Sequence, residues 1–391
     1  MSRRSGMLVL AVVFLINAYA LRAATPDLSQ ISVRAGYALS ISVSGIEDPR
    51  FLALDNQGRL FISRSDDGEI VCCTDKDADG VYEIKTSFIS GHPTVHAMQW
   101  REGWLWFAES GAIYKAQDVN GDGRAEKELP ILRRGTLPSG GSHWYRPLLI
   151  LNKRIYTAIG DSGNITDESA TKRQKIWSYS LEGKDEQLFA SGIRNTEKLV
   201  VRPGTEEIWG MDQGSDWFGR VIEGRNAQQG QPITDSHPHD EMNHYLQNAF
   251  YGHPIICEDS LPRYEFMDRR DILAMASRNT HPEWNAGAHW APESMTFYTG
   301  TQFPNTQGDA FVSYHGSWNR TQPVGNCVTR VLFDQGRPYG EIVYVDFLNR
   351  GSTPLGRPVD SVVASDGSLL ISDDGCDVVY RLRYAGSGQT Q

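Results

Sequence analysis

Short apolar segments alternate with turn residues along most of the chain, and this pattern predicts a protein built almost wholly of β-strands. The clearest example is Leu148–Ile159, in which two apolar, β-branched runs are separated by a polar turn at 152–154. Such a pattern is typical of two antiparallel strands joined tightly. We therefore expect an all-β fold.

A similar unit of strand, turn and strand, often followed by a third strand, recurs six times along the chain. The copies begin at Phe51, His96, Leu148, Lys198, Ser294 and Ser361. The first four begin about 45 to 52 residues apart, which is close to the spacing of propeller blades. A β-sandwich, the alternative architecture, rarely repeats at so even a spacing. The repeats therefore predict a six-bladed β-propeller.

The even spacing fails between the fourth and fifth copies, where the segment 221–289 is inserted. This insertion begins polar and rich in Gly and Gln, and it becomes helical over Asp268–Ala276. Long insertions between blades usually lie on one face of a propeller and shape its binding site. We predict a propeller over residues 25–384, with a loop and helical insertion between blades four and five and a disordered tail at 385–391.

The first 24 residues predict export of the protein. Arg3 and Arg4 precede the apolar run Leu8–Ile16, and small residues follow at Ala20 and Ala23. That order is typical of a secretory signal peptide, and the apolar run is short for a membrane span. We expect a periplasmic or extracellular protein without a stable membrane anchor once residues 1–24 are removed.

Charge and motif content exclude several classes of function. The formal net charge is −10, and no basic patch with interleaved aromatic residues is present, so nucleic acid is not an expected partner. The sequence contains no HExxH zinc motif, no GxSxG nucleophile elbow and no Gly-rich phosphate loop. Five cysteines are present, and the adjacent pair Cys72–Cys73 is compatible with a plain strand or with a strained bridge.

Three polar segments have the composition of metal sites. In the loops 75–80 and 118–123, Asp or Asn alternates with other residues before a Gly, which is compatible with a structural calcium loop or with a plain acidic turn. Neither loop has the Glu that completes an EF-hand. The His-rich segment His237–His244 matches no known ligand spacing, and we interpret it as a polar loop on the propeller face.

The candidate catalytic pair is His143 and Asp161. His143 lies in the segment entering the first strand of the hairpin, and Asp161 follows the second strand. The two ends of a hairpin lie at the same edge of the sheet, so the two side chains can be neighbours. A His held by an Asp is a usable general base near neutral pH. The alternative is a His that caps a loop and an Asp in a turn.

Other polar residues recur at equivalent ends of the remaining repeats. With His143 they include three Arg and three His, which suit a planar, polyanionic ligand in a central channel, since Arg forks carboxylates and stacks on flat rings. Together with His143 and Asp161, the set comprises Arg194, Asn195, Gln213, Gly214, Ser215, His289, Trp290, His315, Arg320 and Arg357.

These residues belong to motifs that resemble the soluble quinoprotein sugar dehydrogenases. The motifs are GGSHWYRPL with GDSGN, ASGIRNTEKLVVRP, DQGS, DEMN with FYGHP, FVSYHGSWNR and GRPVDSVVASDGSLLISDD. That family comprises the aldose and glucose, sorbosone and pyranose dehydrogenases that use pyrroloquinoline quinone (PQQ). The resemblance covers most of the mature chain, and HGSWNR points to the sorbosone and pyranose branch. It implies a six-bladed propeller with PQQ and Ca²⁺ in its central channel.

The resemblance also implies a role for each residue of the set. His143 would be the base that takes the hydroxyl proton of the sugar, with Asp161 orienting it, and hydride would pass from the anomeric carbon to the quinone carbonyl. Arg194 and calcium would polarise that carbonyl. Gln213, Gly214 and Ser215 would form the calcium loop. The cofactor-binding residues would be Arg194, Asn195, His289, Trp290, His315, Arg320 and Arg357.

The function expected on this basis is oxidation of a sugar or related aldehyde, with a cytochrome or a quinone as external electron acceptor. Two departures from the family pattern are Ser215, in place of a Pro, and Thr196–Glu197, where a Pro is usual. Cations for the cofactor carboxylates are also fewer than in the glucose-oxidising members. Two alternatives therefore remain: a carbohydrate-binding propeller that lacks the cofactor, and a calcium-dependent lactonase.

Overall fold

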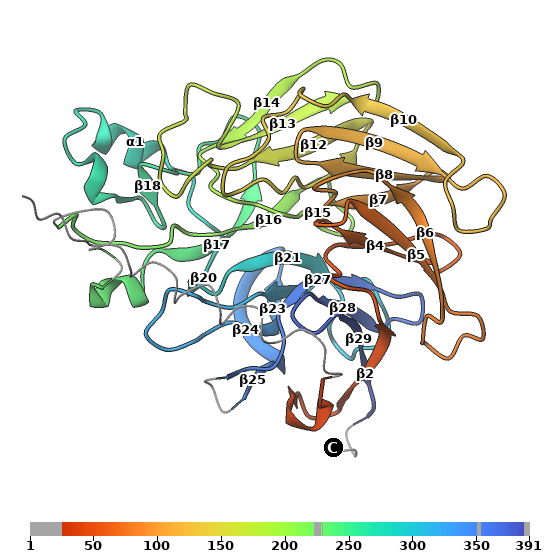
Figure 1. Cartoon of the computed structure of the whole chain (residues 1–391). Coiled ribbons are helices and arrows are strands. Elements are labelled where there is room, and N and C mark those ends of the chain that lie inside the picture. The colour runs from red at the N-terminus through yellow and green to blue at the C-terminus, as the bar shows by residue number, and fades with distance from the viewer. Residues whose placement is uncertain (1–25, 223–227, 229, 350–352, 387–391) are drawn as a thin grey trace, which may run out of the picture.

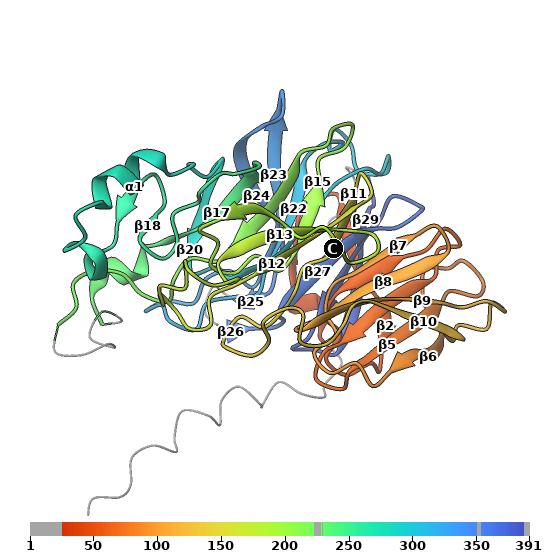
Figure 2. The same cartoon turned by 90° about the horizontal axis from the view of Figure 1, so that it is seen from above.

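Six four-stranded antiparallel units arranged about one axis make up the protein, as a computed structural model shows (Figures 1 and 2). The structure describes residues 26–222, 228, 230–349 and 353–386. The predicted all-β, six-bladed propeller is confirmed. The predicted signal peptide lies outside the described residues. Within the described part of the chain, no helix has the length and apolar character needed to cross a membrane.

Each blade is a meander whose first strand lies closest to the axis. Blade one comprises β3 (Leu52–Leu54), β4 (Leu60–Arg64), β5 (Glu69–Thr74) and β6 (Ile84–Ser90). Blade two comprises β7 (Met98–Arg101), β8 (Trp104–Glu109), β9 (Ala112–Gln117) and β10 (Lys127–Leu132). Blade three comprises β11 (Leu149–Leu151), β12 (Arg154–Ile159), β13 (Lys175–Ser180) and β14 (Gln187–Ser191). A cavity of about 380 Å³ follows the axis and is lined by β3, β7 and β11 with their flanking residues and by residues 198–201, 360 and 362.

Blades four and five follow the same plan, with one addition. Blade four is formed by β15 (Leu199–Val201), β16 (Ile208–Asp212), β17 (His239–Tyr245) and β20 (Trp284–Ala288). Blade five is formed by β21 (Pro292–Phe297), β22 (Ala310–Tyr314), β23 (Cys327–Asp334) and β24 (Arg337–Asp346), and β1 (Ser32–Val33) pairs with its outer edge.

The N-terminal part of the chain completes blade six. That blade consists of β27 (Pro358–Val363), β28 (Leu369–Asp373), β29 (Val378–Tyr384) and β2 (Tyr37–Ser44). The long antiparallel pairing of β2 with β29 joins the two ends of the chain, and the sequence repeats did not predict it. Figure 1 shows the red strand β2 beside the blue C-terminal strands. Ring closure removes the exposed edges that an open array of blades would have.

The hydrophobic core is divided into six clusters, one between each pair of neighbouring blades. Phe61 and Phe107 belong to the cluster between blades one and two, and Leu60 and Val379 belong to the one that closes the ring between blades six and one. Cys72 and Cys73 face different clusters from opposite sides of β5. Both are free thiols, so the plain-strand alternative holds.

Part of the predicted insertion 221–289 belongs to blade four itself. Two of its segments, β17 and β20, are the third and fourth strands of blade four, because their apolar residues pack against β16 and blade five. The irregular excursions lie on either side of β17. They carry the 3₁₀ helices η3 (Pro232–Asp235) and η4 (Tyr264–Phe266), the hairpin of β18 (Ile256–Cys257) and β19 (Leu261–Pro262), and α1 (Ile272–Arg278).

The second excursion has a small core of its own, in which Ile255, Ile256, Ile272 and Met275 are buried together. Its helix and hairpin lie beside the propeller at the left of Figure 1. The remaining short elements are η1 (Leu28–Gln30) and the hairpin of β25 (Leu348–Asn349) and β26 (Thr353–Pro354). Within the described residues, helical structure thus lies at the periphery of the propeller, away from the strands that surround the axis.

Closure by β2 predicts a large stability effect at Leu39, which is 4% exposed in the cluster between blades five and six. Leu39→Ala should lower the free energy of unfolding by about 2–5 kcal/mol, because it removes buried methyl groups and leaves a cavity. Urea unfolding followed by tryptophan fluorescence measures the change. Leu129→Ala, at a residue 47% exposed on β10, is the matched control and should change the value by no more than about 0.5 kcal/mol.

Candidate active site at one end of the propeller axis

Antiparallel pairing places the start of each innermost strand and the end of the next strand at the same end of the blade. His143 precedes β11 and Asp161 follows β12, while Arg194 precedes β15 and Gln213 follows β16. His315 follows β22 in the same way. The predicted residues come from different blades and therefore converge at one end of the axis.

His143 and Asp161 are neighbours, but the contact differs from the one expected. The Nδ1 atom of His143 lies 2.8 Å from the main-chain carbonyl oxygen of Asp161, not from its carboxylate. A carbonyl can only accept, so Nδ1 carries the proton and Nε2 keeps its lone pair. Nε2 has no hydrogen-bond partner among the described residues. The imidazole is thus held in the tautomer that a general base requires.

The surroundings of His143 keep its imidazole neutral. Burial lowers the pKa of His143 to about 3, and the nearby positive charge of Arg194 acts in the same direction. Gly160 lies between His143 and the main chain of Arg194. A Cβ at this position would lie 2.6 Å from the Arg194 carbonyl oxygen and 2.8 Å from His143 Cβ. Only a glycine allows these two segments to meet.

The carboxylate of Asp161 organises the loop beneath His143. It accepts hydrogen bonds from the main-chain N–H groups of Gly163 and Thr166 and from the Gln174 amide, and it lies 2.8 Å from His253 Nε2. Burial would raise the pKa of Asp161, but these hydrogen bonds, with that of His253 the largest, hold it well below its usual value. His253 was not assigned a role from the sequence, although its FYGHP motif was noted.

Arg194 and Asn195 are buried and fixed by neighbouring loops. The Arg194 guanidinium donates to the carbonyl and side-chain oxygens of Asn164 and pairs with Asp216 at 2.8 Å. Asn195 donates from its side chain to Gln213 Oε1 at 3.0 Å. The main-chain N–H groups of both residues donate to the carboxylate of Asp212, which is the last residue of β16.

The loop Gln213–Ser215 leaves two consecutive carbonyl oxygens unpartnered. Its backbone is fixed by the bond from Gly214 N–H to Asp240 Oδ1 at 2.8 Å. A Cβ at Gly214 would lie 2.6 Å from the His239 carbonyl oxygen, so the loop packs directly on β17. Among the described residues, no hydrogen bond ends on the carbonyl oxygens of Gly214 or Ser215. Adjacent free carbonyls are ligands that Ca²⁺ accepts.

His289, Trp290 and Arg320 lie beside this loop. The Nε2 atom of His289 is 2.6 Å from the carbonyl oxygen of Thr234, and burial lowers the pKa of His289. Among the described residues, Arg320 donates one hydrogen bond, to the carbonyl oxygen of Ala288, and its buried Nε atom has no partner. Trp290 packs edge-on against Tyr314. Arg320 therefore has donors to spare.

His315 and Arg357 meet at the opposite side of the axis. The Arg357 guanidinium lies 3.0–3.2 Å from the ring nitrogens of His315, and its side chain remains 42% exposed. His315 Nε2 is 2.9 Å from a carboxylate oxygen of Asp374 and His315 Nδ1 is 3.6 Å from Glu293. The cationic side of the predicted site thus faces carboxylates that were not expected there.

Arg50 is the residue at the axis that the sequence analysis missed. Its guanidinium lies 2.6 Å from Asp374, 2.7 Å from Glu293 and 3.5 Å from Glu197, which come from three blades. The ring of Tyr145 lies over it, with the guanidinium carbon 4.6 Å from the ring centroid. Burial and the charge of Glu293 raise the pKa of Glu197 well above its usual value.

The two acidic loops lie away from the axis, on blades one and two. The Asp118 carboxylate accepts from the N–H groups of Gly121 and Gly123 and pairs with Arg59 at 2.5 Å. Asp75 accepts from Gly80 N–H, and its other oxygen is buried and has no hydrogen-bond partner in the described part of the chain. Arg59 balances the charge of Asp118, which favours a plain acidic turn at 118–123. For 75–80 both alternatives stand.

Fold and site together define a six-bladed propeller with a polar, axial site assembled from several blades. Residues 31–384 match the model of the TrAA12-like family, so the chain belongs to that family. An uncharacterised protein of Borreliella burgdorferi is 26% identical over 96% of each chain.

Solved structures with the same fold include members of the group that the motifs resemble. The carbohydrate-active enzyme family AA12 protein of Trichoderma reesei, in a calcium structure, is 17% identical with a TM-score of 0.76, covering 90% of this chain and 97% of that one. The holo PQQ domain of pyranose dehydrogenase from Coprinopsis cinerea is 18% identical, with the same score and coverage. The PQQ-bound aldose sugar dehydrogenase of Streptomyces coelicolor is 14% identical with a TM-score of 0.61, covering 90% and 99%. The expected family resemblance is confirmed.

The environment of His143 predicts an imidazole that stays neutral well below pH 6. In ¹⁵N-labelled protein, the ring nitrogens of His143 should show the Nδ1–H tautomer from pH 8 to pH 5. The second nitrogen is protonated only when the pH falls towards the pKa of His143, which is about 3. His143→Gln assigns the signal by removing it. Titration with a midpoint close to 6.5, the value of an unperturbed His, would contradict the burial argument.

Proposed function

We propose that the protein is a quinoprotein oxidoreductase that uses PQQ and Ca²⁺ and oxidises a sugar or related aldehyde at the anomeric carbon. The observation that carries the proposal is the neutral, Nδ1-protonated His143, which lies next to Arg194 and has a free Nε2. Membership of the TrAA12-like family and the PQQ-bound relatives support the same chemistry.

The donor set at the axis fits a planar polyanion together with a hard cation. The free carbonyl oxygens of Gly214 and Ser215, beside Gln213, would hold Ca²⁺. Arg320, with its unpartnered Nε, and the half-exposed Arg357 would bind carboxylates. Arg194, Asn195, His289, Trp290 and His315 would complete the cofactor-binding set. When bound, PQQ supplies the two-electron acceptor for the hydrogen that leaves the sugar carbon as hydride.

In this proposal each residue around His143 has one task. Nε2 of His143 accepts the proton of the sugar hydroxyl, while the Asp161 carbonyl holds the ring in position through Nδ1. Before the substrate reacts, the positive charge of Arg194 disfavours the protonated form of His143. During the reaction the same charge stabilises negative charge that develops in the site. Asp161 acts through its main chain on His143 and through its carboxylate on the loop 163–166.

We further infer that the protein acts outside the cytoplasm on a small sugar and passes electrons to an external cytochrome or quinone. The predicted signal peptide supports export, and the net charge of −10 supports the expectation that nucleic acid is not a partner.

A carbohydrate-binding propeller without the cofactor is the second candidate, and one observation favours it. Asp374 and Glu293 both pair with His315, and Asp374 also approaches Arg357 at 3.9 Å. These contacts lower the positive charge available for the three carboxylates of PQQ. A calcium-dependent lactonase is less favoured. It would need side-chain carboxylates free to hold an ion, whereas Glu293 and Asp374 are paired with Arg50 and Asp161 with His253.

Reconstitution tests the proposal. Purified protein loaded with PQQ and Ca²⁺ should reduce a dye with at least one member of a panel of aldoses and aldehydes. His143→Gln should lower kcat/KM by about 10²–10⁴-fold, the usual contribution of a general base. It should leave PQQ binding, measured by calorimetry, unchanged, because Gln can still donate to the Asp161 carbonyl.

His281→Gln, at an exposed residue that bonds Ser260, is the matched control and should keep wild-type activity. No PQQ binding and no dye reduction across the panel would overturn the proposal. Sugar binding of equal strength in cofactor-free wild-type protein and in His143→Gln would establish the carbohydrate-binding alternative.

A further inference from the structure

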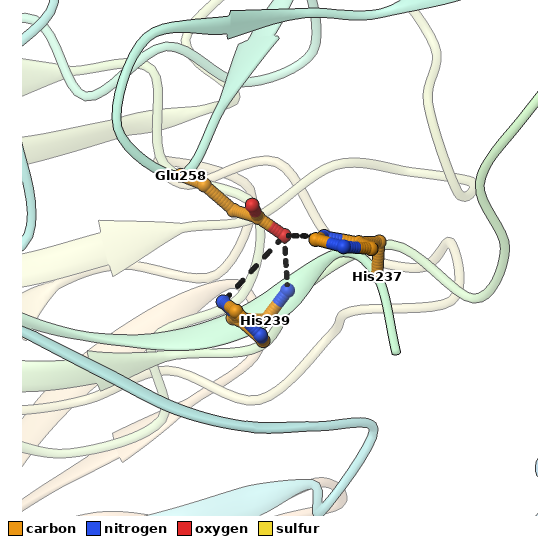
Figure 3. A group of neighbouring side chains, drawn as sticks. All are labelled: His237, His239 and Glu258. Atoms are coloured by element: carbon orange, nitrogen blue, oxygen red, sulfur yellow. Dashed lines mark hydrogen bonds and ion pairs between the residues drawn. The ribbon is translucent and has the colours of Figure 1, made fainter. Parts of the chain in front are cut away.

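His237, His239 and Glu258 form a cluster next to the axial site, where His239 lines a small cavity together with Arg194 and Gly214. One nitrogen of each imidazole and one carboxylate oxygen lie within 4.8 Å of one another. Glu258 Oε1 is 2.8 Å from His237 Nδ1 and 3.7 Å from His239 Nδ1, and Figure 3 shows both rings directed at the carboxylate. The His-rich segment was interpreted from its sequence as a polar loop, because its His spacing matched no ligand set. That interpretation was wrong for His239–Tyr245, which is strand β17, and Glu258 is distant along the chain.

We propose that this cluster binds a divalent transition-metal ion, for which Zn²⁺ is the probe. Two imidazole nitrogens with one carboxylate oxygen suit Zn²⁺, Cu²⁺ or Ni²⁺, whereas Ca²⁺ prefers oxygen ligands alone. The proposal does not depend on the activity of the axial site.

The geometry is close to what a tetrahedral ion requires. With metal–ligand bonds of about 2.0–2.1 Å, neighbouring ligand atoms lie about 3.3 Å apart. The present separations of 2.8 and 3.7 Å from Glu258 Oε1 lie on either side of that value. The His237 and His239 side chains are 33% and 32% exposed, so their rings have room to adjust to an ion.

One atom of the cluster lacks a partner. Nδ1 of His239 is buried and makes no hydrogen bond within the described chain, although it points at Glu258. Buried polar atoms are nearly always satisfied, so an orphan of this kind indicates a missing ligand. A metal ion between the three side chains would satisfy Nδ1 and would replace the close His237–Glu258 contact with two bonds to the ion.

The carboxylate is held in place by its surroundings. Glu258 has a φ of +52°, a left-handed conformation that non-glycine residues rarely adopt. Its N–H donates to Glu241 Oε1 at 2.8 Å, and its carbonyl accepts from the Asn279 side chain at 3.1 Å. The β18–β19 turn is thus pinned so that the carboxylate faces the start of β17. A bound ion would link the peripheral excursion to blade four.

Calorimetric titration with Zn²⁺ in the presence of excess Ca²⁺, which fills oxygen-only sites, tests the proposal. Wild-type protein should bind one equivalent. Loss of a residue that only supports a metal ligand lowers metal affinity by about 10–100-fold. His239→Gln and Glu258→Gln should each lower the Zn²⁺ affinity by more than this, because each removes a direct ligand. The Glu258→Gln variant keeps the side-chain size and the acceptor for His239 N–H, so it tests ligation even where the His variant is unstable.

His244→Gln is the matched control, because this half-buried His lies on the same strand but stacks on Trp209 at 5.1 Å, away from Glu258. It should bind Zn²⁺ as the wild type does. Bound Cu²⁺ should show nitrogen hyperfine splitting by electron paramagnetic resonance, and Zn²⁺ should raise Tm in wild-type protein but not in His239→Gln. Equal Zn²⁺ affinity in wild type, His239→Gln and Glu258→Gln, or no binding at all, would overturn the proposal.

Discussion

The buried contact of Arg50 with three carboxylates is the interaction on which the axial site depends. Glu197, Glu293 and Asp374 belong to blades four, five and six, and Arg50 leads into blade one. Burial alone would lower the pKa of Arg50, but Tyr145 and the carboxylates keep its pKa well above the usual value. A buried cation is tolerated only when it is paired in this way, and removal of one partner would leave uncompensated charge. The contact therefore fixes both the positions of the blades and the charge at their shared end.

This arrangement also limits what the site can bind. Three acidic groups near the axis would repel an anion if they were all ionised and free. Burial raises the pKa of Glu197 well above its usual value, Glu293 is paired with Arg50, and Asp374 is shared between Arg50 and His315. Arg320 and Arg357 then keep donors for a ligand, while Arg194 lies beside neutral His143. The pairing of acids with Arg50 makes an anionic ligand compatible with an acidic axis.

The sequence predicted the fold well because the repeated unit is local. Each strand, turn and strand is encoded within a few tens of residues, as in the hairpin before Asp161, so the pattern of apolar positions identified six blades. It did not identify the closure by β2, since pairing with β29 joins segments at opposite ends of the chain. It also placed β17 and β20 in an insertion, because polar excursions of blade four interrupt the even spacing.

The same distinction applies to the site. His143 and Asp161 could be placed together because one hairpin carries both, yet the use of the Asp161 carbonyl could not be seen without coordinates. His253 and Glu293 act across blades, and nothing local marks them, whereas Arg50 precedes the first strand of its blade as Arg194 does. Asp374 did follow a second strand, as Asp161 and Gln213 do, so the rule that found those residues would have found it as well.

Strand β17 connects the axial site to the metal cluster through the alternation of its side chains. Asp240 faces the site, where it accepts from the N–H groups of Gly214 and Ala291. His239 and Glu241, one residue to either side, face Glu258. Alternate residues of a strand point to opposite faces, so both sets are fixed by a single register. A shift of β17 by one residue would remove the support of the Gly214 loop and break up the cluster at once. The excursion that follows β17, although peripheral in the fold, is therefore held in register with the centre of the propeller.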